Sequence, residues 1–116
     1  MTYTTINDDL SVSSQIYTDD IEQIIKSGFR SIICNRPDGE TPDQPDFVTI
    51  ASHAKQAGLE ALYIPVTPGE MQEKQAVQFA AALRTLPGPI LAYCRSGARS
   101  SAIWKRQKEL AENNSN

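Results

Sequence analysis

Twelve residues decide the fold of this chain: Pro89-Ile90-Leu91-Ala92-Tyr93-Cys94-Arg95-Ser96-Gly97-Ala98-Arg99-Ser100. The apolar run before the cysteine predicts a short buried strand, and the small and basic residues after it predict a tight loop. Ser100 is expected to open a helix. This stretch therefore predicts a strand, a loop and a helix N-terminus with a thiol at the strand end.

The rest of the chain alternates in the same way. Apolar periodicity and the stop signals Gly28, Gly58 and Pro87-Gly88 predict helices at 18–28, 46–57, 70–86 and 100–112, and strands at 10–12, 31–34, 59–66 and 89–93. Alternating strands and helices predict an α/β fold with a small, mainly parallel sheet flanked by helices. We expect one domain over residues 1–116, with a frayed polar tail at 111–116. The loops after the strands should converge at one edge of the sheet.

The composition is that of one ordinary globular domain. The chain has 116 residues, is 40% hydrophobic and carries a formal net charge of −3. These values predict no attraction to nucleic acid or acidic membranes, and no apolar run is long enough to span a bilayer. Two cysteines and one histidine are too few for a disulfide framework or a zinc site. We therefore expect a cytoplasmic protein with reduced thiols and with neither metal nor cofactor.

The loop after the last strand has the chemistry of a nucleophile beside an anion site. A helix N-terminus and a nearby cation both favour the thiolate form of Cys94. Backbone N–H groups from Arg95 through Ser96, Gly97 and Ala98 can turn inward around an anion, and Arg99 can bind two of its oxygens. The Ser100 hydroxyl is expected to donate a hydrogen bond to the thiolate. The alternative is a buried structural cysteine.

Four further residues are candidates at the same edge of the sheet. Arg36 could bind an anion and Asp38 could supply a proton, or both could belong to a turn that bonds its own backbone. Glu70 could act as an acid, although the first turn of its predicted helix is the favoured place for it. Cys34 could be a resolving thiol if both sulfurs face one crevice, and is otherwise a small buried side chain.

Several of these residues carry a family resemblance. The loop resembles the signature loop of cysteine-dependent tyrosine and dual-specificity phosphatases, and is similar to that of rhodanese-type sulfurtransferases. More of the chain resembles the phosphatase-like domain of beta-lactamase hydrolase-like proteins, through Gly28-Phe29-Arg30-Ser31-Ile32-Ile33, Asn35-Arg36-Pro37-Asp38-Gly39-Glu40, Ile64-Pro65-Val66, Tyr93 to Ser100 and Trp104. This resemblance implies a dual-specificity-phosphatase-like fold of reduced size.

Two departures from the phosphatase pattern favour sulfur chemistry. Four residues separate Cys94 from Arg99, whereas such phosphatases have five, and the segment 63–70 has no aspartate where they place a general acid. The leading hypothesis is therefore transfer of sulfane sulfur, from a persulfide or thiosulfate, through a Cys94 persulfide to a thiol acceptor or an oxidoreductase protein. The alternative is hydrolysis of phosphomonoesters through a phosphocysteine. A third possibility is a non-catalytic module that binds an anion or a partner.

Overall fold

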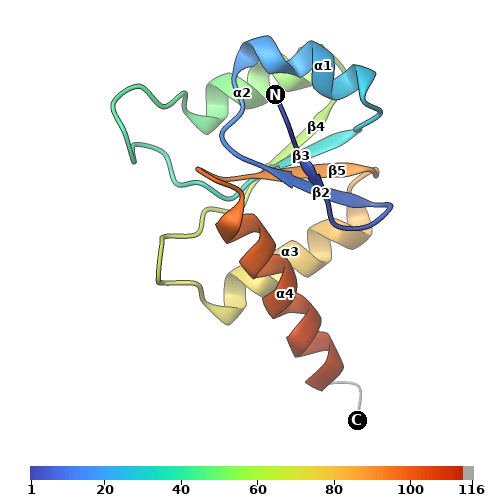
Figure 1. Cartoon of the computed structure of the whole chain (residues 1–116), viewed down its shortest axis with the longest axis vertical. Helices are drawn as coiled ribbons and strands as arrows, with labels where there is room; N and C mark the ends of the chain where they lie inside the picture. The colour runs from blue at the N-terminus through green and yellow to red at the C-terminus, as the bar shows by residue number, and fades with distance from the viewer. Residues whose placement is uncertain (114–116) are drawn as a thin grey trace.

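A computed structural model describes residues 1–113, which form a sheet with helices on both faces (Figure 1). The strands are β1 (Thr4–Thr5), β2 (Leu10–Ser13), β3 (Ser31–Cys34), β4 (Glu60–Tyr63) and β5 (Ile90–Tyr93). A 3-10 helix (Thr18–Asp20) precedes the helices α1 (Ile21–Lys26), α2 (Phe47–Gln56), α3 (Glu73–Thr85) and α4 (Ala98–Asn113).

The sheet is mainly parallel, as predicted. Its strand order is β1-β2-β5-β3-β4, with parallel pairing except where β1 joins β2 antiparallel. β5 lies between β2 and β3, and Tyr93 pairs with Ser13 on one side and with Cys34 on the other. The cysteine loop therefore leaves the sheet at its centre, with a loop on each side.

Each face of the sheet packs against one pair of helices. Figure 1 shows α1 and α2 on one face and α3 and α4 on the other. Alternate strand residues divide accordingly: Ile33 and Ala92 join the cluster that includes Phe79 and Ile103, whereas Ile32 and Leu91 join the cluster that includes Ile24 and Ile50. All positions of β2, β3 and β5 are buried, because both faces of these strands are covered.

Some predicted boundaries differ from the structure. The first predicted helix is split into the 3-10 turn and α1, and Thr18 is not its cap; Asp20 accepts the Tyr17 N–H at 2.8 Å instead. α4 begins at Ala98, before the predicted start at Ser100. The two-residue strand β1 was not predicted, since so short a strand has no periodicity to detect.

The C-terminal segment is helical further than expected. α4 ends at Asn113, one residue beyond the predicted helix end at 112, so residues 111–113 of the segment expected to fray are helical, and residues 114–116 lie outside the described part of the chain. Within residues 1–113, no helix is long and apolar enough to cross a membrane. The same residues contain no group of three His, Cys, Asp or Glu side chains placed to hold a metal ion.

Candidate active site

The cysteine loop lies at the sheet edge where the parallel strands end. Because Cys34 pairs with Tyr93, the residues that follow them, Asn35 and Cys94, leave adjacent strands at the same level. The segment after β4 joins them there, since the Val66 N–H donates to the Asn35 carbonyl at 2.9 Å. The loops expected to converge are therefore in contact.

Cys94 is the first residue after β5, and its sulfur is held by the loop that follows. The residue is 1% exposed, and the Gly97 N–H donates to its Sγ atom at 3.0 Å. Gly97 has a φ angle of +95°, and a Cβ atom there would lie 3.4 Å from the Ser13 carbonyl oxygen. Glycine is therefore required both for the backbone conformation and for the close approach of β2.

Most of the remaining N–H groups of the loop are free to donate hydrogen bonds to an anion. The Ala98 N–H donates to Ser96 Oγ at 3.3 Å. The backbone N–H groups of Arg95, Ser96, Arg99 and Ser100 have no acceptor within residues 1–113. They stand at the N-terminus of the long helix α4, whose dipole also favours negative charge. The exposed side chains of Arg95 and Ser96 lie at the rim.

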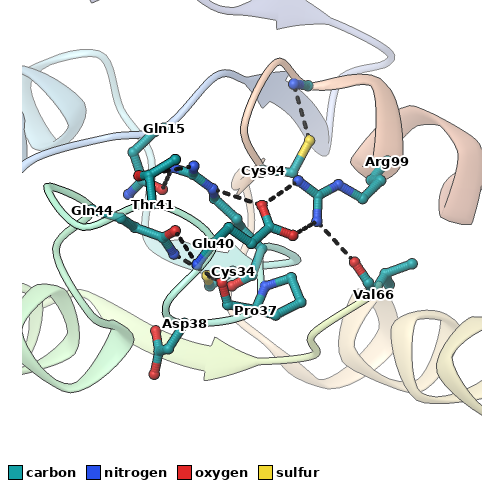
Figure 2. Close-up of polar contacts among 12 residues, drawn as sticks. Gln15, Cys34, Pro37, Asp38, Glu40, Thr41, Gln44, Val66, Cys94 and Arg99 are labelled. Carbon is teal, nitrogen blue, oxygen red and sulfur yellow. Dashed lines mark hydrogen bonds and ion pairs between the residues drawn. The ribbon is translucent and has the colours of Figure 1, made fainter. Parts of the chain in front are cut away.

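Arg99 is fixed by two residues on neighbouring loops (Figure 2). Its Nη1 donates to Glu40 Oε2 at 2.7 Å and to the Val66 carbonyl at 2.9 Å, and its Nη2 donates to Glu40 Oε1 at 2.8 Å. A guanidinium has five N–H groups, so these bonds leave the Nε–H and the outer Nη2 N–H, which form one edge of the plane. Arg99 also interacts with the Cys94 side chain, and no oxygen of residues 1–113 accepts a hydrogen bond from this edge, which can bind two oxygens of a substrate.

Glu40 connects Arg99 to a second arginine. The buried Arg36 donates from Nε to Glu40 Oε1 at 2.9 Å and from Nη1 to Gln15 at 3.0 Å. The hydrogen bond from Arg99, followed by that from Arg36, lowers the pKa of the Glu40 carboxyl, and Glu40 in turn raises the pKa of Arg99. Arg36 thus holds Glu40 in place, and the structure does not support Arg36 as an anion ligand.

The predicted contact between Ser100 and the cysteine is wrong. Ser100 is fully buried, and its hydroxyl donates to Asn35 Oδ1 at 2.8 Å rather than to Cys94. The Asn35 amide also donates to the Ile64 carbonyl at 2.9 Å. Asn35 and Ser100 therefore join α4 to the loops after β3 and β4, and so fix the position of the cysteine loop.

Neither of the predicted alternative acids faces the cysteine loop. The exposed Asp38 accepts the Phe47 N–H at 2.8 Å, and its own N–H donates to the Tyr63 hydroxyl at 2.9 Å. The Asp38 carboxylate thus bonds the start of α2, whereas the turn hypothesis expected it to bond the backbone of its own turn, and it does not contact the cysteine loop.

Glu70 is also outside the site, and its predicted place in a helix is wrong. The exposed Glu70 ends a turn in which its N–H donates to the Thr67 carbonyl at 3.0 Å, before α3 begins. Gln72 caps α3 instead, its N–H donating to Gln75 Oε1 at 2.8 Å. Of Asp38, Glu70 and Glu40, only Glu40 contacts the cysteine loop, through its bonds to Arg99. Those bonds lower the pKa of the Glu40 carboxyl and keep it ionised.

Cys34 is a buried structural thiol. It packs in the cluster against α1 and α2, and its Sγ donates to the Arg36 carbonyl at 3.3 Å. Burial raises the pKa of the Cys34 thiol to about 11. In Figure 2, its sulfur lies well apart from that of Cys94. Both cysteines are free, and each sulfur bonds the backbone of its own loop, so nothing in the described chain supports the resolving-thiol hypothesis.

Sequence reasoning missed two residues of this site, Glu40 and Asn35. Both lie in the segment 35–40, which carries part of the family resemblance. The spacing of four between Arg36 and Glu40 was an available sign of an ion pair. No local pattern identifies their bonds to α4, because Glu40 and Asn35 are 59 and 65 residues from Arg99 and Ser100 respectively.

The fold and the site define a phosphatase-like domain of the tyrosine and dual-specificity phosphatase fold class. A solved structure of a candidate phosphatase from Neisseria meningitidis is 37% identical, covers 90% of this chain and 75% of its own, and superposes with a TM-score of 0.84. PTPMT1, at 18% identity and a TM-score of 0.70 over 97% of this chain and 74% of its own, shares the fold.

The family model of the beta-lactamase hydrolase-like protein, phosphatase-like domain, matches residues 2–111, and the chain belongs to this family. A beta-lactamase hydrolase-like protein from Xylella fastidiosa strain Temecula1 is 36% identical over 99 residues, which are 85% of this chain and 23% of that protein. The chain thus spans about a quarter of the length of the curated relatives it matches.

Proposed function

We propose that this domain hydrolyses phosphate monoesters through a phosphocysteine on Cys94. The observation that carries the proposal is the sulfur held by the Gly97 N–H at 3.0 Å, inside a loop in which the N–H groups of Arg95, Ser96, Arg99 and Ser100 lack acceptors among residues 1–113. Membership of a phosphatase-like family supports phosphate over sulfur as the group transferred. The preference for sulfur transfer, which rested on the loop length and the missing aspartate, therefore takes second place.

The reaction proceeds in two displacements. The Cys94 thiolate attacks phosphorus, an S–P bond forms, and the ester O–P bond breaks with its electron pair leaving on oxygen. The loop N–H groups and the free edge of Arg99 stabilise the charge on the phosphoryl oxygens. Water then attacks phosphorus, releasing inorganic phosphate and restoring the thiolate.

The leaving oxygen receives no proton from a carboxylic acid of the site. Glu40 is ion-paired to Arg99 and Arg36, and this pairing lowers its pKa, so it is not a proton donor. A positioned general acid typically contributes about 10²–10⁴-fold in rate. We therefore propose substrates whose leaving group is stable as an anion, such as a phenolate, a carboxylate or a phosphate.

Hydrolysis of p-nitrophenyl phosphate tests this proposal, because its leaving group needs no proton. We expect turnover by the wild-type chain, loss of turnover in Cys94→Ser, and retention of turnover in the matched variant Cys34→Ala. Absence of turnover in the wild type, or turnover that survives Cys94→Ser, would overturn the proposal.

Sulfane sulfur transfer is the second candidate, favoured by the four-residue spacing between Cys94 and Arg99. The thiolate would attack the outer sulfur of thiosulfate, forming an S–S bond while sulfite leaves with the electron pair, and an acceptor thiolate would then take that sulfur. The acceptor would be a small thiol or an oxidoreductase protein. A mass gain of one sulfur atom on Cys94, reversed by a thiol, would support this reaction.

A domain that shows neither reaction and still binds sulfate at the loop would be an anion-binding module. Both reactions need a reduced thiol, so we propose that the domain works in a reducing compartment such as the cytoplasm.

A further inference from the structure

A cavity of about 420 Å³ opens beside the cysteine loop. It lies between the segment after β4 and the first turns of α4, where Val66, Met71, Ala98, Arg99 and Ala102 line it. Arg99 and Ala98 also belong to the anion-binding loop, so the cavity lies directly beside the site. In a phosphatase of this class, the segment after β4 would carry the acid; here it forms a cavity wall instead.

The cavity suits an uncharged, apolar group. Its lining is mostly aliphatic, and the charge of Arg99 is balanced by the Glu40 carboxylate at 2.7 and 2.8 Å. Ala98 and Ala102 are four residues apart and therefore lie on one side of α4, where their small side chains leave room. A further phosphate or other charged group in this cavity would lose hydration without gaining a free cationic partner.

The other side of α4 is chemically different. A second cavity, of about 440 Å³, is lined by hydroxyl side chains that include Ser13, Ser14, Ser96 and Ser101. An organic group attached to an anion on the loop could extend to either side. Burial of an apolar group is favourable only where the lining is apolar, which selects the side of Ala102.

We infer that the substrate is the phosphate monoester of an apolar phenol, whose organic group binds in the cavity between Met71 and Ala102. This inference rests on the proposed phosphatase function and narrows it. The phosphoryl group binds at the loop N–H groups and Arg99, and the organic group contacts Val66, Met71 and the two alanines. Sugar phosphates are then poor substrates, because their organic groups are hydroxylated and would leave as alkoxides.

The test compares an apolar substrate with a small one in matched variants of α4. Ala102→Phe fills the apolar cavity, and Ser101→Phe fills the hydroxyl-lined cavity one residue away. Ala102 is exposed on the helix surface and Ser101 is half-buried beside open space, so neither change disturbs the core. The substrates are 1-naphthyl phosphate and acetyl phosphate, whose leaving groups both depart without a proton.

We expect Ala102→Phe to raise the KM for 1-naphthyl phosphate roughly tenfold, as the loss of an apolar subsite requires. The KM of this variant for acetyl phosphate should stay within about twofold of the wild-type value. Ser101→Phe should leave both unchanged. An equal effect on both substrates, no effect of Ala102→Phe, or the same loss in Ser101→Phe would overturn the inference.

A binding measurement separates the two proposals. If the wild type hydrolyses neither ester, the phosphatase function fails, and the cavity is then judged by calorimetric titration with 1-naphthalenesulfonate. Binding that is weakened by Ala102→Phe and unaffected by Ser101→Phe would still support the apolar subsite. Absence of binding to the wild type, or weakening in both variants, would refute it.

Discussion

Replacing Glu40 by glutamine removes the anionic partner of two arginines at the site. The carboxylate accepts bonds of 2.7 and 2.8 Å from Arg99 and of 2.9 Å from Arg36, and the exposed fractions of these side chains are 19%, 14% and 5% respectively. Leaving a buried charge without its partner costs about 3–5 kcal/mol. Partial exposure of Glu40 and Arg99 puts the expected loss of unfolding free energy near the lower end, about 3 kcal/mol.

The same variant should impair catalysis, because Arg99 loses the contact that orients its free edge. Misplacement of a binding group by about 1 Å can cost roughly 10²-fold in rate, and we expect a fall of that order in kcat/KM for p-nitrophenyl phosphate. The stability assay is urea unfolding, and the control is Glu73→Gln. Glu73 pairs with Arg106 at 3.0 Å, with exposed fractions of 68% and 39%, so its loss should cost no more than about 1 kcal/mol.

The pH dependence gives an independent check. Pairing with Arg99 lowers the pKa of Glu40 below its ordinary value of 4.5. A lowered pKa in the folded state contributes stability that is present above the ordinary value and is lost as the pH falls through the folded value. The difference in unfolding free energy between the wild type and Glu40→Gln should therefore be full at neutral pH and shrink in acid. An effect of Glu40→Gln equal to that of Glu73→Gln, or a difference that persists unchanged in strong acid, would refute the reasoning.

Three further outcomes are expected. Gly97→Ala forces a side chain into a φ of +95° and against the Ser13 carbonyl at 3.4 Å, so urea unfolding should show a loss of about 1–2 kcal/mol with reduced turnover. Ser100→Ala leaves the buried Asn35 Oδ1 without its donor and should cost about 1–3 kcal/mol in the same assay; an unchanged midpoint would contradict this. Cys34, with a pKa of about 11, should resist iodoacetamide in the folded chain and react after unfolding, as peptide mass mapping will show.

The helices and strands that depend on local sequence patterns could be predicted from the sequence. The bounds of β3 match those expected, and the other three predicted strands differ from the structure by a few residues at most, whereas β1 was not predicted. Strands alternating with helices indicated a parallel sheet, and the parallel sheet placed the loops after β3, β4 and β5 at one edge. These inferences succeed because apolar periodicity and stop signals act over a few residues.

The contacts that complete the site could not be predicted in this way. The bond between Ser100 and Asn35 depends on where α4 begins, and an early start at Ala98 turns the Ser100 side chain into the core. Glu70 was placed in a helix, although the turn from Thr67 delays α3. Each outcome is decided by packing between segments distant in sequence, which a local pattern does not record.

The charges around the cysteine loop balance one another, and this balance determines how an anion is bound. Arg99 and Arg36 carry two positive charges, and both arginines pair with the Glu40 carboxylate, which lies between them. With little net charge in this set, attraction comes from directed donors: the unpartnered loop N–H groups and the free edge of Arg99. Directed donors select by shape and distance, so the length of the loop sets which anion fits. Glu40 holds Arg99 in a fixed position. The distance between the loop N–H groups and the arginine is therefore fixed as well, and the length of the loop determines that distance.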